Sequence, residues 1–514
     1  MARLFLILFF CFNVVFNYAQ SLKHYDIAEG DEHFEHRNYL MALPIYKENL
    51  RREKDNILLN YRIAECYLNT NINKSEAVKY LEFCVKSPKA NSQMYFRLGE
   101  AYRIAYKLDD AIKAFEKYKE LEPKQKNNAD RQIEICRNAK TLMANPVNIS
   151  FTNLGKGINT EWDDYYPFIA QDEQFLAFTS RRKALPNSKV ETDGYYSSDI
   201  YTSNLENGKW LDAVNIGPKI NSKLDEIIIG LKSDGSEMLV YIDHIDKFGD
   251  IYTSVKKNGA YPKYTPFPEF INKKFEKTAS ISGDGNTLVF TRAEDLQAQS
   301  DLFICRKLPS GEWSTPFKIG DEINTIYDED FPYLSDDGLT LYFISKGHNT
   351  MGGYDLFKSY WNSNDLKWSK AENLGYPLNT TDDDKSISLT NDCRVGYISA
   401  WRPGGFGNHD IYRVRFNDHE QRLTLFLGQI ILGDSLNKPK EFIANVFAVN
   451  NITDEEFSFA PNPRNGKLVM SLPVGIYDVT VTSDGYKELK DKITVSDIGA
   501  ILTEEKKSYK LLKK

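Results

Sequence analysis

Residues and motifs that build catalytic or metal sites are scarce in this sequence. Seven histidines are spread from His24 to His419 without an H-x-x-x-H pair, and none of the six cysteines stands in a C-x-x-C spacing. Those spacings supply the ligands of zinc sites. A nucleophile elbow, a Walker loop and a dinucleotide-binding fingerprint are missing as well. We therefore expect no catalytic residue, no metal and no cofactor.

Basic patches and long apolar runs are almost as rare. The formal net charge is −7 without a basic stripe, which argues against nucleic acid as a partner. One long apolar run, residues 4–16, follows Arg3 and precedes the small residue Ala19, which predicts a secretory signal peptide over residues 1–19. Cys11 lies in this run behind two phenylalanines, where a lipoprotein signal needs small residues, so lipidation is the lesser alternative. After export the chain, then at −8, is expected to be soluble and peripheral to the membrane.

Five cysteines remain beyond the signal peptide, and an odd number leaves at least one thiol unpaired. We interpret them as small, buried apolar residues. Cys66 and Cys84, on consecutive expected helices, are the one pair that could form a bridge.

A tripeptide of aspartate, Ile or Leu, and an aromatic residue recurs five times. Its aspartates are spaced by 51, 51, 54 and 55 residues, and they are Asp199, Asp250, Asp301, Asp355 and Asp410. A period near 50 residues is typical of propeller blades. Each period has two apolar runs around a turn such as Asp337-Gly338, and most carry an Ile-Asn or Leu-Asn pair, so it predicts four short antiparallel strands. We interpret the aspartates as hydrogen-bond acceptors that brace the blades.

The two ends of the repeat region complement each other. The fifth repeat lacks the tryptophan and the Ile-Asn pair that follow other repeats, whereas residues 147–155 and Ile158-Asn159 carry the outer-strand pattern with no blade before them. We predict that this N-terminal strand completes the last blade, so that the ring closes without an open edge. The sequence thus predicts a five-bladed β-propeller over residues 146–419.

Residues 20–145 change to a helical period. One unit resembles the tetratricopeptide repeat in its order of aromatic, Leu-Gly, Tyr, Ala, Phe and final Pro, carried by Tyr95, Leu98, Gly99, Tyr102, Ala111, Phe115 and Pro123. A weaker copy precedes it by 35 residues, with Ala64 in the place of Gly99. Such a stack presents a concave face to a partner protein, or it only braces the propeller. Both interpretations stay open.

Residues 420–514 return to strand patterns. Alternating runs at 423–431, 444–449, 466–472, 476–481 and 492–495 predict a small antiparallel β-sandwich. The stretch from Gly466 to Tyr477 resembles the carboxypeptidase regulatory-like domain. This resemblance implies an accessory module in which the strand before Pro473-Val474-Gly475 pairs with the strand after it.

Carboxylates gather just before the first strand of several repeats. We call eight of them the acidic rim and take them as candidate binding residues: Asp163, Asp164, Asp225, Glu226, Asp328, Asp330, Asp382 and Asp384. Glu276, Glu329 and Asp383 belong to the same pattern. If the blade starts meet at one mouth of the propeller, these side chains form a ring there.

Three interpretations of the acidic rim compete. The favoured one is that the carboxylates cap turns, since a turn motif is copied whenever a blade is copied. A second is a site for calcium or a basic partner. The third is glycoside hydrolysis by a pair of carboxylates. That chemistry needs two acids in different environments, whereas this sequence has near-copies in every repeat.

The order of signal peptide, tetratricopeptide repeats, WD40-like (TolB-type) propeller and regulatory-like sandwich resembles the PorE-like and OmpA-family envelope proteins of Bacteroidetes. The resemblance implies a non-enzymatic scaffold, peripheral to the outer membrane in the periplasm. Its partners are expected to be envelope proteins, such as a PorP/SprF-type outer-membrane protein or a component of the type IX secretion or gliding machinery.

Members of this family usually end in an OmpA-like peptidoglycan-binding domain. The present sequence stops at Lys514 without one, so we do not expect direct binding to peptidoglycan. The alternative function is that of a secreted propeller glycosidase or carbohydrate-binding protein that uses the acidic rim.

Overall fold

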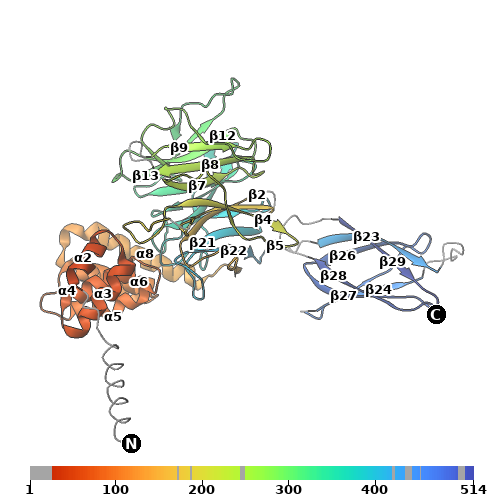
Figure 1. Ribbon diagram of the computed structural model, residues 1–514, viewed down its shortest axis with the longest axis horizontal. Helices are drawn as coiled ribbons and strands as arrows, with labels where there is room; N and C mark the ends of the chain where they lie inside the picture. Colours follow the sequence, from red (N-terminus) through yellow and green to blue (C-terminus); the bar gives the residue numbers. More distant parts are fainter. Residues whose placement is uncertain are drawn as a thin grey trace, which may run out of the picture. The chain divides into compact units, whose positions relative to one another are not determined.

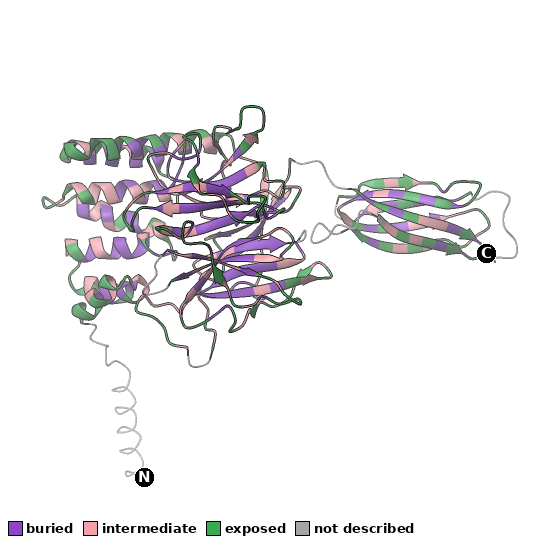
Figure 2. Cartoon of the chain, turned by 90° about the horizontal axis from the view of Figure 1, so that it is seen from above, coloured by how far each residue is buried: buried purple, intermediate pink, exposed green. Residues whose placement is uncertain are grey.

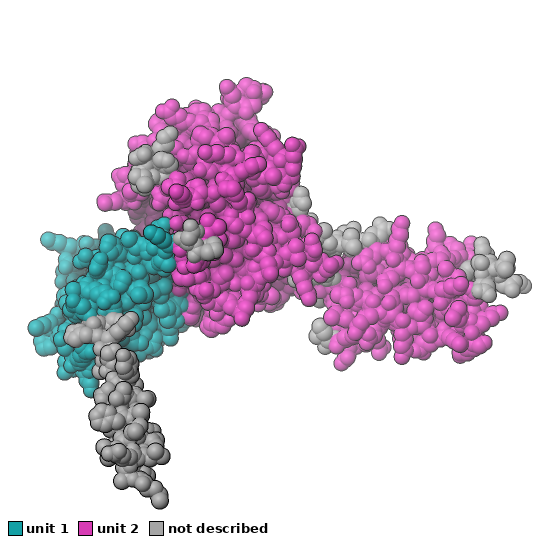
Figure 3. Space-filling model, in the orientation of Figure 1, with its two compact units in different colours: residues 1–136, 189–195 teal, residues 137–188, 196–514 magenta. Residues whose placement is uncertain are grey.

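The computed structural model describes residues 26–170, 173–185, 188–243, 249–418, 423–433, 443–451, 453–495 and 504–514. The expected signal peptide and Cys11 lie outside these residues. The chain divides into two compact units, residues 1–136 with 189–195 and residues 137–188 with 196–514 (Figure 3). Among the residues described here, no helix has the length and apolar character needed to cross a bilayer.

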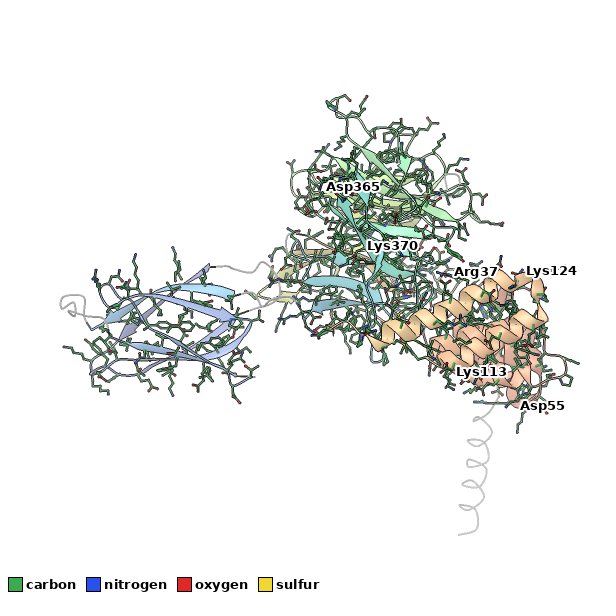
Figure 4. The ribbon with its side chains drawn as sticks, turned by 180° about the vertical axis from the view of Figure 1, so that it is seen from behind. Arg37, Asp55, Lys113, Lys124, Asp365 and Lys370 are labelled. Carbon is green, nitrogen blue, oxygen red and sulfur yellow. The ribbon has the colours of Figure 1, made fainter. Side chains whose placement is uncertain are left out.

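Seven α-helices lie in the N-terminal part of the described chain (Figure 1). They are α2 (Ile27–Glu35), α3 (Tyr39–Arg52), α4 (Ile57–Leu68), α5 (Ala77–Val85), α6 (Ser92–Ile104), α7 (Leu108–Leu121) and α8 (Lys126–Ala144), with short 3₁₀ turns η1 (Lys74–Glu76) and η2 (Pro123–Gln125). Helices α3, α4 and α6 begin after an asparagine whose side chain accepts a hydrogen bond from the third residue along, which satisfies an otherwise unpaired amide. Charged side chains such as Asp55, Lys113 and Lys124 are exposed on this unit (Figure 4).

The small residues of the helical pattern lie where helices pack closely. A Cβ atom on Gly99 of α6 would come within 2.6 Å of the Phe115 ring of α7. Leu98, Ala111 and Phe115 are all buried. The Tyr102 hydroxyl donates to Glu82 Oε1 at 2.8 Å and so connects α6 to α5. Cys66 and Cys84 are buried free thiols without a bridge.

Residues 149–416 form five antiparallel sheets, one for each repeat. The first holds β2 (Asp164–Ala170), β3 (Phe175–Ser180), β4 (Asp199–Glu206), β5 (Lys209–Trp210) and β6 (Val214–Asn215). The second holds β7 (Asp225–Leu231), β8 (Glu237–Asp243), β9 (Ile251–Val255) and β10 (Thr265–Pro266), and the third β11 (Phe275–Ile281), β12 (Thr287–Ala293), β13 (Ser300–Arg306) and β14 (Phe317–Lys318). The fourth holds β15 (Glu329–Leu334), β16 (Thr340–Ser345), β17 (Asp355–Asn362), β18 (Lys367–Trp368) and β19 (Glu372–Asn373). The fifth holds β20 (Ser388–Leu389), β21 (Val395–Ala400), β22 (Asp410–Phe416) and β1 (Ile149–Asn153).

The first strands contact their neighbours in the pairs β2 with β7, β7 with β11, β11 with β15 and β20 with β2, and the Tyr333 hydroxyl of β15 donates to the Leu389 carbonyl of β20 at 2.9 Å. This circuit is the organisation of a β-propeller. Hydroxyl groups connect neighbouring sheets. Thr179 accepts from the Ile228 amide at 3.1 Å, and Ser280 accepts from the Leu334 amide at 2.8 Å. Ser388 of the fifth sheet accepts from the Ile169 amide of the first sheet at 3.1 Å. Because their side chains pack between sheets, the strands are largely buried (Figure 2).

Strand β1 is the outer strand of the fifth sheet. It pairs antiparallel with β22, with Ile149 opposite Phe416 and Asn153 opposite Tyr412. This confirms the predicted pairing of residues 147–155 with the fifth repeat. The edge of β22 is therefore covered by a strand that precedes it by more than 250 residues.

The C-terminal residues form two facing sheets around a shared apolar core. One sheet has the order β26 (Lys467–Pro473), β23 (Leu423–Leu432), β29 (Glu504–Leu511), and the other has the order β25 (Glu456–Phe459), β24 (Asn445–Asn450), β27 (Gly475–Thr482), β28 (Leu489–Val495). The expected pairing of the strands around Pro473-Val474-Gly475 is wrong, since β26 pairs with β23 and β27 pairs with β24 and β28. These residues carry the chain from one sheet to the other. The Tyr477 hydroxyl, donating to the Pro473 carbonyl at 2.9 Å, holds this crossover.

Candidate functional site

The Ile-Asn and Leu-Asn pairs have the same role in all five sheets. Each asparagine side chain accepts from the amide and donates to the carbonyl of the middle residue of a tripeptide, as Asn379 does with Leu356 at 2.7 and 2.9 Å. The other pairs are Asn159 with Ile411, Asn221 with Ile200, Asn272 with Ile251 and Asn324 with Leu302. The side-chain amide thus makes the two hydrogen bonds that a backbone residue of a neighbouring strand would otherwise make. These bonds fix the turn that leads to the next sheet.

Four of the five tripeptide aspartates accept hydrogen bonds or pair with a lysine within their own sheet. Asp199, Asp355 and Asp410 each accept from an asparagine of the outer strand, at 3.1, 2.8 and 2.7 Å. Asp301 pairs with the Lys318 ammonium at 2.8 Å. Burial raises the pKa of Asp199 and of Asp355 to about 6. These contacts are the ones that a bracing role requires.

Three of the eight acidic-rim residues, and the related Glu276 and Glu329, are turned into the sheets. Asp164, Glu226 and Asp384 are buried, and each accepts from the backbone amide of the residue four places earlier, Thr160, Ser222 and Thr380, at 2.6, 2.9 and 2.6 Å. Glu329 does the same with Thr325 at 2.7 Å and also accepts from Ser345 Oγ at 2.6 Å. Glu276 in the third sheet is paired with Arg292. These five carboxylates cap the turns that follow the Ile-Asn pairs.

Burial also sets the proton affinity of these groups. Burial raises the pKa of Glu226 and of Glu329 to about 7. Hydrogen bonds oppose this rise: those from Ser222 lower the pKa of Glu226, and those from Ser345 and Thr325 lower the pKa of Glu329. Burial and then the charge of Asp355 raise the pKa of Asp384 well above its usual range. Burial raises the pKa of Asp164 less, because the Arg182 guanidinium lies 2.6 Å away and opposes it.

At the start of four of the sheets, a carboxylate connects that sheet to the preceding one. Asp225, Asp328 and Asp383 accept from the backbone amides of Ser198, Ser300 and Tyr354, each of which precedes a tripeptide aspartate of the preceding sheet. Asp163 instead pairs with His409 Nδ1 at 2.7 Å. Burial raises the pKa of Asp163, but the His409 and Arg181 charges outweigh it, so the pKa is lowered.

The structure brings together only some of the predicted rim residues. Asp163, Asp330 and Asp383, from the first, fourth and fifth sheets, all lie near enough to Tyr166 to raise its pKa, after burial as the main cause. Asp330, Asp328 and Asp383 act in the same way on Tyr354. Asp225 and Glu226 instead lie near Asp199 and are not part of this group.

A lysine completes this group. Burial alone would lower the pKa of Lys385, but the charges of Asp383, Asp382 and Asp163 outweigh it and the pKa is raised. The Lys385 ammonium lies 3.2 Å from Asp383 Oδ2. We call Asp163, Asp330, Asp383, Lys385, Tyr166 and Tyr354 the rim cluster.

Tyr166 of the rim cluster and the neighbouring Phe331 have backbone angles that the sequence analysis did not predict. Tyr166 in β2 and Phe331 in β15 have φ of 53° and 49°, a region that bulky residues rarely adopt. Each lies in a β-bulge, and their rings are 4.2 Å apart. A proline follows each of them, and proline inside a strand-like run is the signal that could have predicted a bulge here.

The described parts of the chain hold no group of three or more His, Cys, Asp or Glu residues that could hold a metal ion. The carboxylates contact backbone amides, hydroxyls and the charged side chains of Arg182, Arg292, His409 and Lys385. Asp383 is exposed and the other members of the rim cluster are half-buried, so tyrosine rings, carboxylates and an ammonium group are partly accessible to a polar partner.

Comparisons with known proteins give little beyond this geometry. No family model matches the chain, and no curated protein matches it either. Among solved structures, a TolB protein from Agrobacterium tumefaciens is 14% identical and covers 53% of this chain and 98% of its own, with a TM-score of 0.29. A glycoside hydrolase is 7% identical over 54% of this chain and 94% of its own, with a TM-score of 0.36.

A protein of unknown function from Dyadobacter fermentans is 10% identical over 63% of this chain and 98% of its own, with a TM-score of 0.33. TM-scores this low carry no argument about a common fold or activity. The propeller assignment therefore rests on the strand pairing of this chain.

Proposed function

We propose that this chain is a non-enzymatic scaffold that binds other proteins of the bacterial envelope. In this proposal the five sheets are the blades of a closed five-bladed propeller, the helices are tetratricopeptide-like pairs, and the sandwich follows as an accessory module. The resemblance to PorE-like proteins suggests a periplasmic place beside the outer membrane and a partner from type IX secretion or gliding machinery.

The main support for the proposal is that buried carboxylates of the acidic rim hold the turns between strands. The carboxylates with the most raised pKa among the rim residues, Glu226 and Asp384, are buried and already accept hydrogen bonds from backbone amides. A general acid must instead reach the substrate. Because their buried geometry serves the turns of the propeller, these acids support a structural framework rather than a reaction.

The packing of the helical unit also supports a scaffold that binds proteins. Its pairs of antiparallel helices pack through small residues such as Gly99 and Ala111, as in helical repeats that bind peptides or proteins.

Cross-linking of intact envelopes tests the proposal. Cells that make the chain natively are treated with a lysine-reactive cross-linker, and peptides from residues 26–145 and 146–418 are analysed by mass spectrometry. We expect cross-links to outer-membrane or secretion-system proteins. Recovery of the chain free and soluble, with cross-links only to itself, contradicts the scaffold.

A carbohydrate-binding or glycosidase function is the second candidate, and the rim cluster favours it. Tyrosine rings beside carboxylates are suited to stacking on a sugar and binding its hydroxyls, and Tyr166, Tyr354 and Asp330 have this arrangement. Incubation of the purified chain with envelope and plant polysaccharides tests it. Release or retention of an oligosaccharide that is lost in Asp330→Asn, and kept in the exposed control Asp365→Asn, establishes this candidate (Figure 4).

A further inference from the structure

One face of the C-terminal sandwich has an unusual composition. Along β23, residues 424, 426, 430 and 432 are buried in the core, so Leu423, Leu425, Leu427 and Ile431 point outward. They are exposed to 53, 42, 36 and 39%. The outward positions of a strand in contact with water are normally polar, whereas four of the five outward positions of β23 are apolar and only Gln429 is polar.

The neighbouring strands extend the apolar area and frame it with positive charge. Val469 of β26 lies directly opposite Leu427 and is 56% exposed. On the other side, Lys506 of β29 lies opposite Leu427, and Lys510 lies opposite Ile431. Lys467, at the end of β26, is exposed as well. Figure 2 shows exposed and buried segments alternating along these strands.

The second sheet of the sandwich provides the contrast. Its outward residues include Phe447, which is 40% exposed. The polar residue Thr480 lies directly opposite Phe447, and Asp478 lies two residues before Thr480 on the same strand. Ile476, Asp478, Lys490 and Lys492 are exposed on the same face, so apolar, acidic and basic residues are mixed there. A run of exposed apolar residues along one strand therefore belongs to the first sheet and not to the second.

We propose that the outward face of the sheet β26-β23-β29 is a docking surface for a protein partner whose own surface is apolar at its centre and acidic around it. This inference rests on the proposed scaffold function and names the surface and the chemistry of one partner. The apolar stripe supplies a centre that excludes water, and the lysines require carboxylates opposite them.

Charge selects this occupant among the alternatives. A second copy of the same face would bring Lys467, Lys506 and Lys510 against their equivalents, and Glu504, at the outward register position opposite Leu425, is the one carboxylate among the described outward positions of the sheet to compensate three lysines. A flat sheet face also differs from the helices and protruding loops that enter lipid. A protein surface with an apolar centre and acidic surroundings can pack against the apolar residues and pair its carboxylates with the lysines.

Site-specific photo-cross-linking in intact cells tests the inference on the full-length chain. Benzoylphenylalanine replaces Val469 on the proposed face, and Phe447 on the opposite sheet in a matched control of similar exposure. We expect a protein adduct at position 469 at least about tenfold stronger than at position 447, with the cross-linked partner segment rich in Asp and Glu. The double charge reversal Lys506→Glu with Lys510→Glu should lower the adduct on the order of tenfold, while Lys490→Glu with Lys492→Glu on β28 leaves it unchanged.

Three results overturn the inference. These are an adduct at position 469 no stronger than at 447, an adduct to the chain itself, or flotation of the purified chain with phosphatidylglycerol vesicles that is lost in Leu427→Ser. The lysine-reactive cross-linking described above is run on the same cells. Partners found there without an adduct at 469 reject this docking face alone, whereas the absence of both rejects the scaffold as well.

Discussion

At the scale of single residues, the asparagine after each Ile or Leu holds the repeat together. Asn379 is fully buried, and it satisfies both the amide and the carbonyl of Leu356. Alanine at this position leaves two backbone groups without partners in an apolar environment. The cost is that of desolvated, unsatisfied polar groups and not only of the lost hydrogen bonds.

We expect Asn379→Ala to lower the free energy of unfolding by about 1–3 kcal/mol. Urea denaturation followed by near-UV circular dichroism measures the change. Asn364→Ala, at an exposed turn of the same sheet, is the control and should leave the midpoint where it is. Equal midpoints for both variants would show that the side-chain amide is dispensable.

The raised pKa values of Glu226 and Glu329 predict a pH dependence of stability. Their pKa is about 7 in the folded chain and near 4.5 when unfolded, so the folded state binds more protons between these values. Stability from these groups is full below pH 4.5 and is lost as the pH rises through 7. We expect Tm to fall between pH 5 and 8, and to fall less in Glu226→Gln with Glu329→Gln.

Differential scanning fluorimetry at pH 5, 6, 7 and 8 checks this slope. Glu312→Gln, at an exposed turn, serves as the control and should retain the slope of the unaltered chain. A glutamine variant with the same slope as the control would mean that these carboxylates are ionised at no cost in the folded state.

At the scale of elements, close backbone contacts connect the loops of one sheet to the turns of the next. A Cβ atom on Gly407, between β21 and β22, would lie 2.0 Å from the Trp162 carbonyl oxygen before β2. Gly352 has the equivalent contact with the Asp382 carbonyl oxygen at 2.2 Å. Only glycine fits where these loops pass.

We expect Gly407→Ala to destabilise the propeller by about 1–3 kcal/mol, because backbone atoms must move apart to admit the methyl group. Gly320→Ala is the matched control, since a Cβ atom on Gly320 would have no other atom within 4 Å. Urea midpoints of the two variants give the comparison. If both shift equally, the cause is backbone entropy and not the contact.

How far the sequence predicts this structure depends on repetition. The five asparagines and five aspartates recur in phase, so a shared structural place follows from the sequence alone. Tyr166 and Phe331 occur in only two of the five first strands, and their backbone angles depend on packing against each other, so no periodic signal announced them. In the sandwich, the family resemblance implies that the strands around Pro473 pair with each other, which is wrong, and local turn residues could not correct it because they do not determine which sheet receives the next strand.

At the scale of the whole molecule, the first and last sheets are joined by a buried network with no repeated counterpart. Glu173 accepts from Arg413 Nε at 2.6 Å and from the Tyr397 hydroxyl at 2.7 Å, and Trp210 Nε1 donates to that hydroxyl at 3.3 Å. Glu173 and Arg413 are 240 residues apart in sequence. Single residues so far apart give no pattern from which their pairing could be predicted.

We expect Glu173→Ala to cost about 3–5 kcal/mol, because it leaves the Arg413 guanidinium buried without its counter-charge. The double variant Glu173→Leu with Arg413→Leu should recover part of this loss, since neither charge is then buried. Urea denaturation of the single and double variants gives the coupling energy. A double variant less stable than Glu173→Ala would argue against the explanation by an unpaired charge.

The pairing of β1 with β22 has a mechanical consequence. The chain enters the propeller at Ile149 and leaves it at Phe416, and these residues face each other at one end of an antiparallel ladder. Tension between the helices before this point and the sandwich after it pulls the two strands apart from that end, one pair at a time, instead of shearing all pairs together. The bonds that take this load first include the Val147 amide donating to the Tyr376 carbonyl at 2.7 Å, the Asn417 amide donating to the Asn148 carbonyl at 2.9 Å, and Asn148 Nδ2 donating to Asp418 at 2.8 Å. The propeller is thus built to open under load at its fifth sheet.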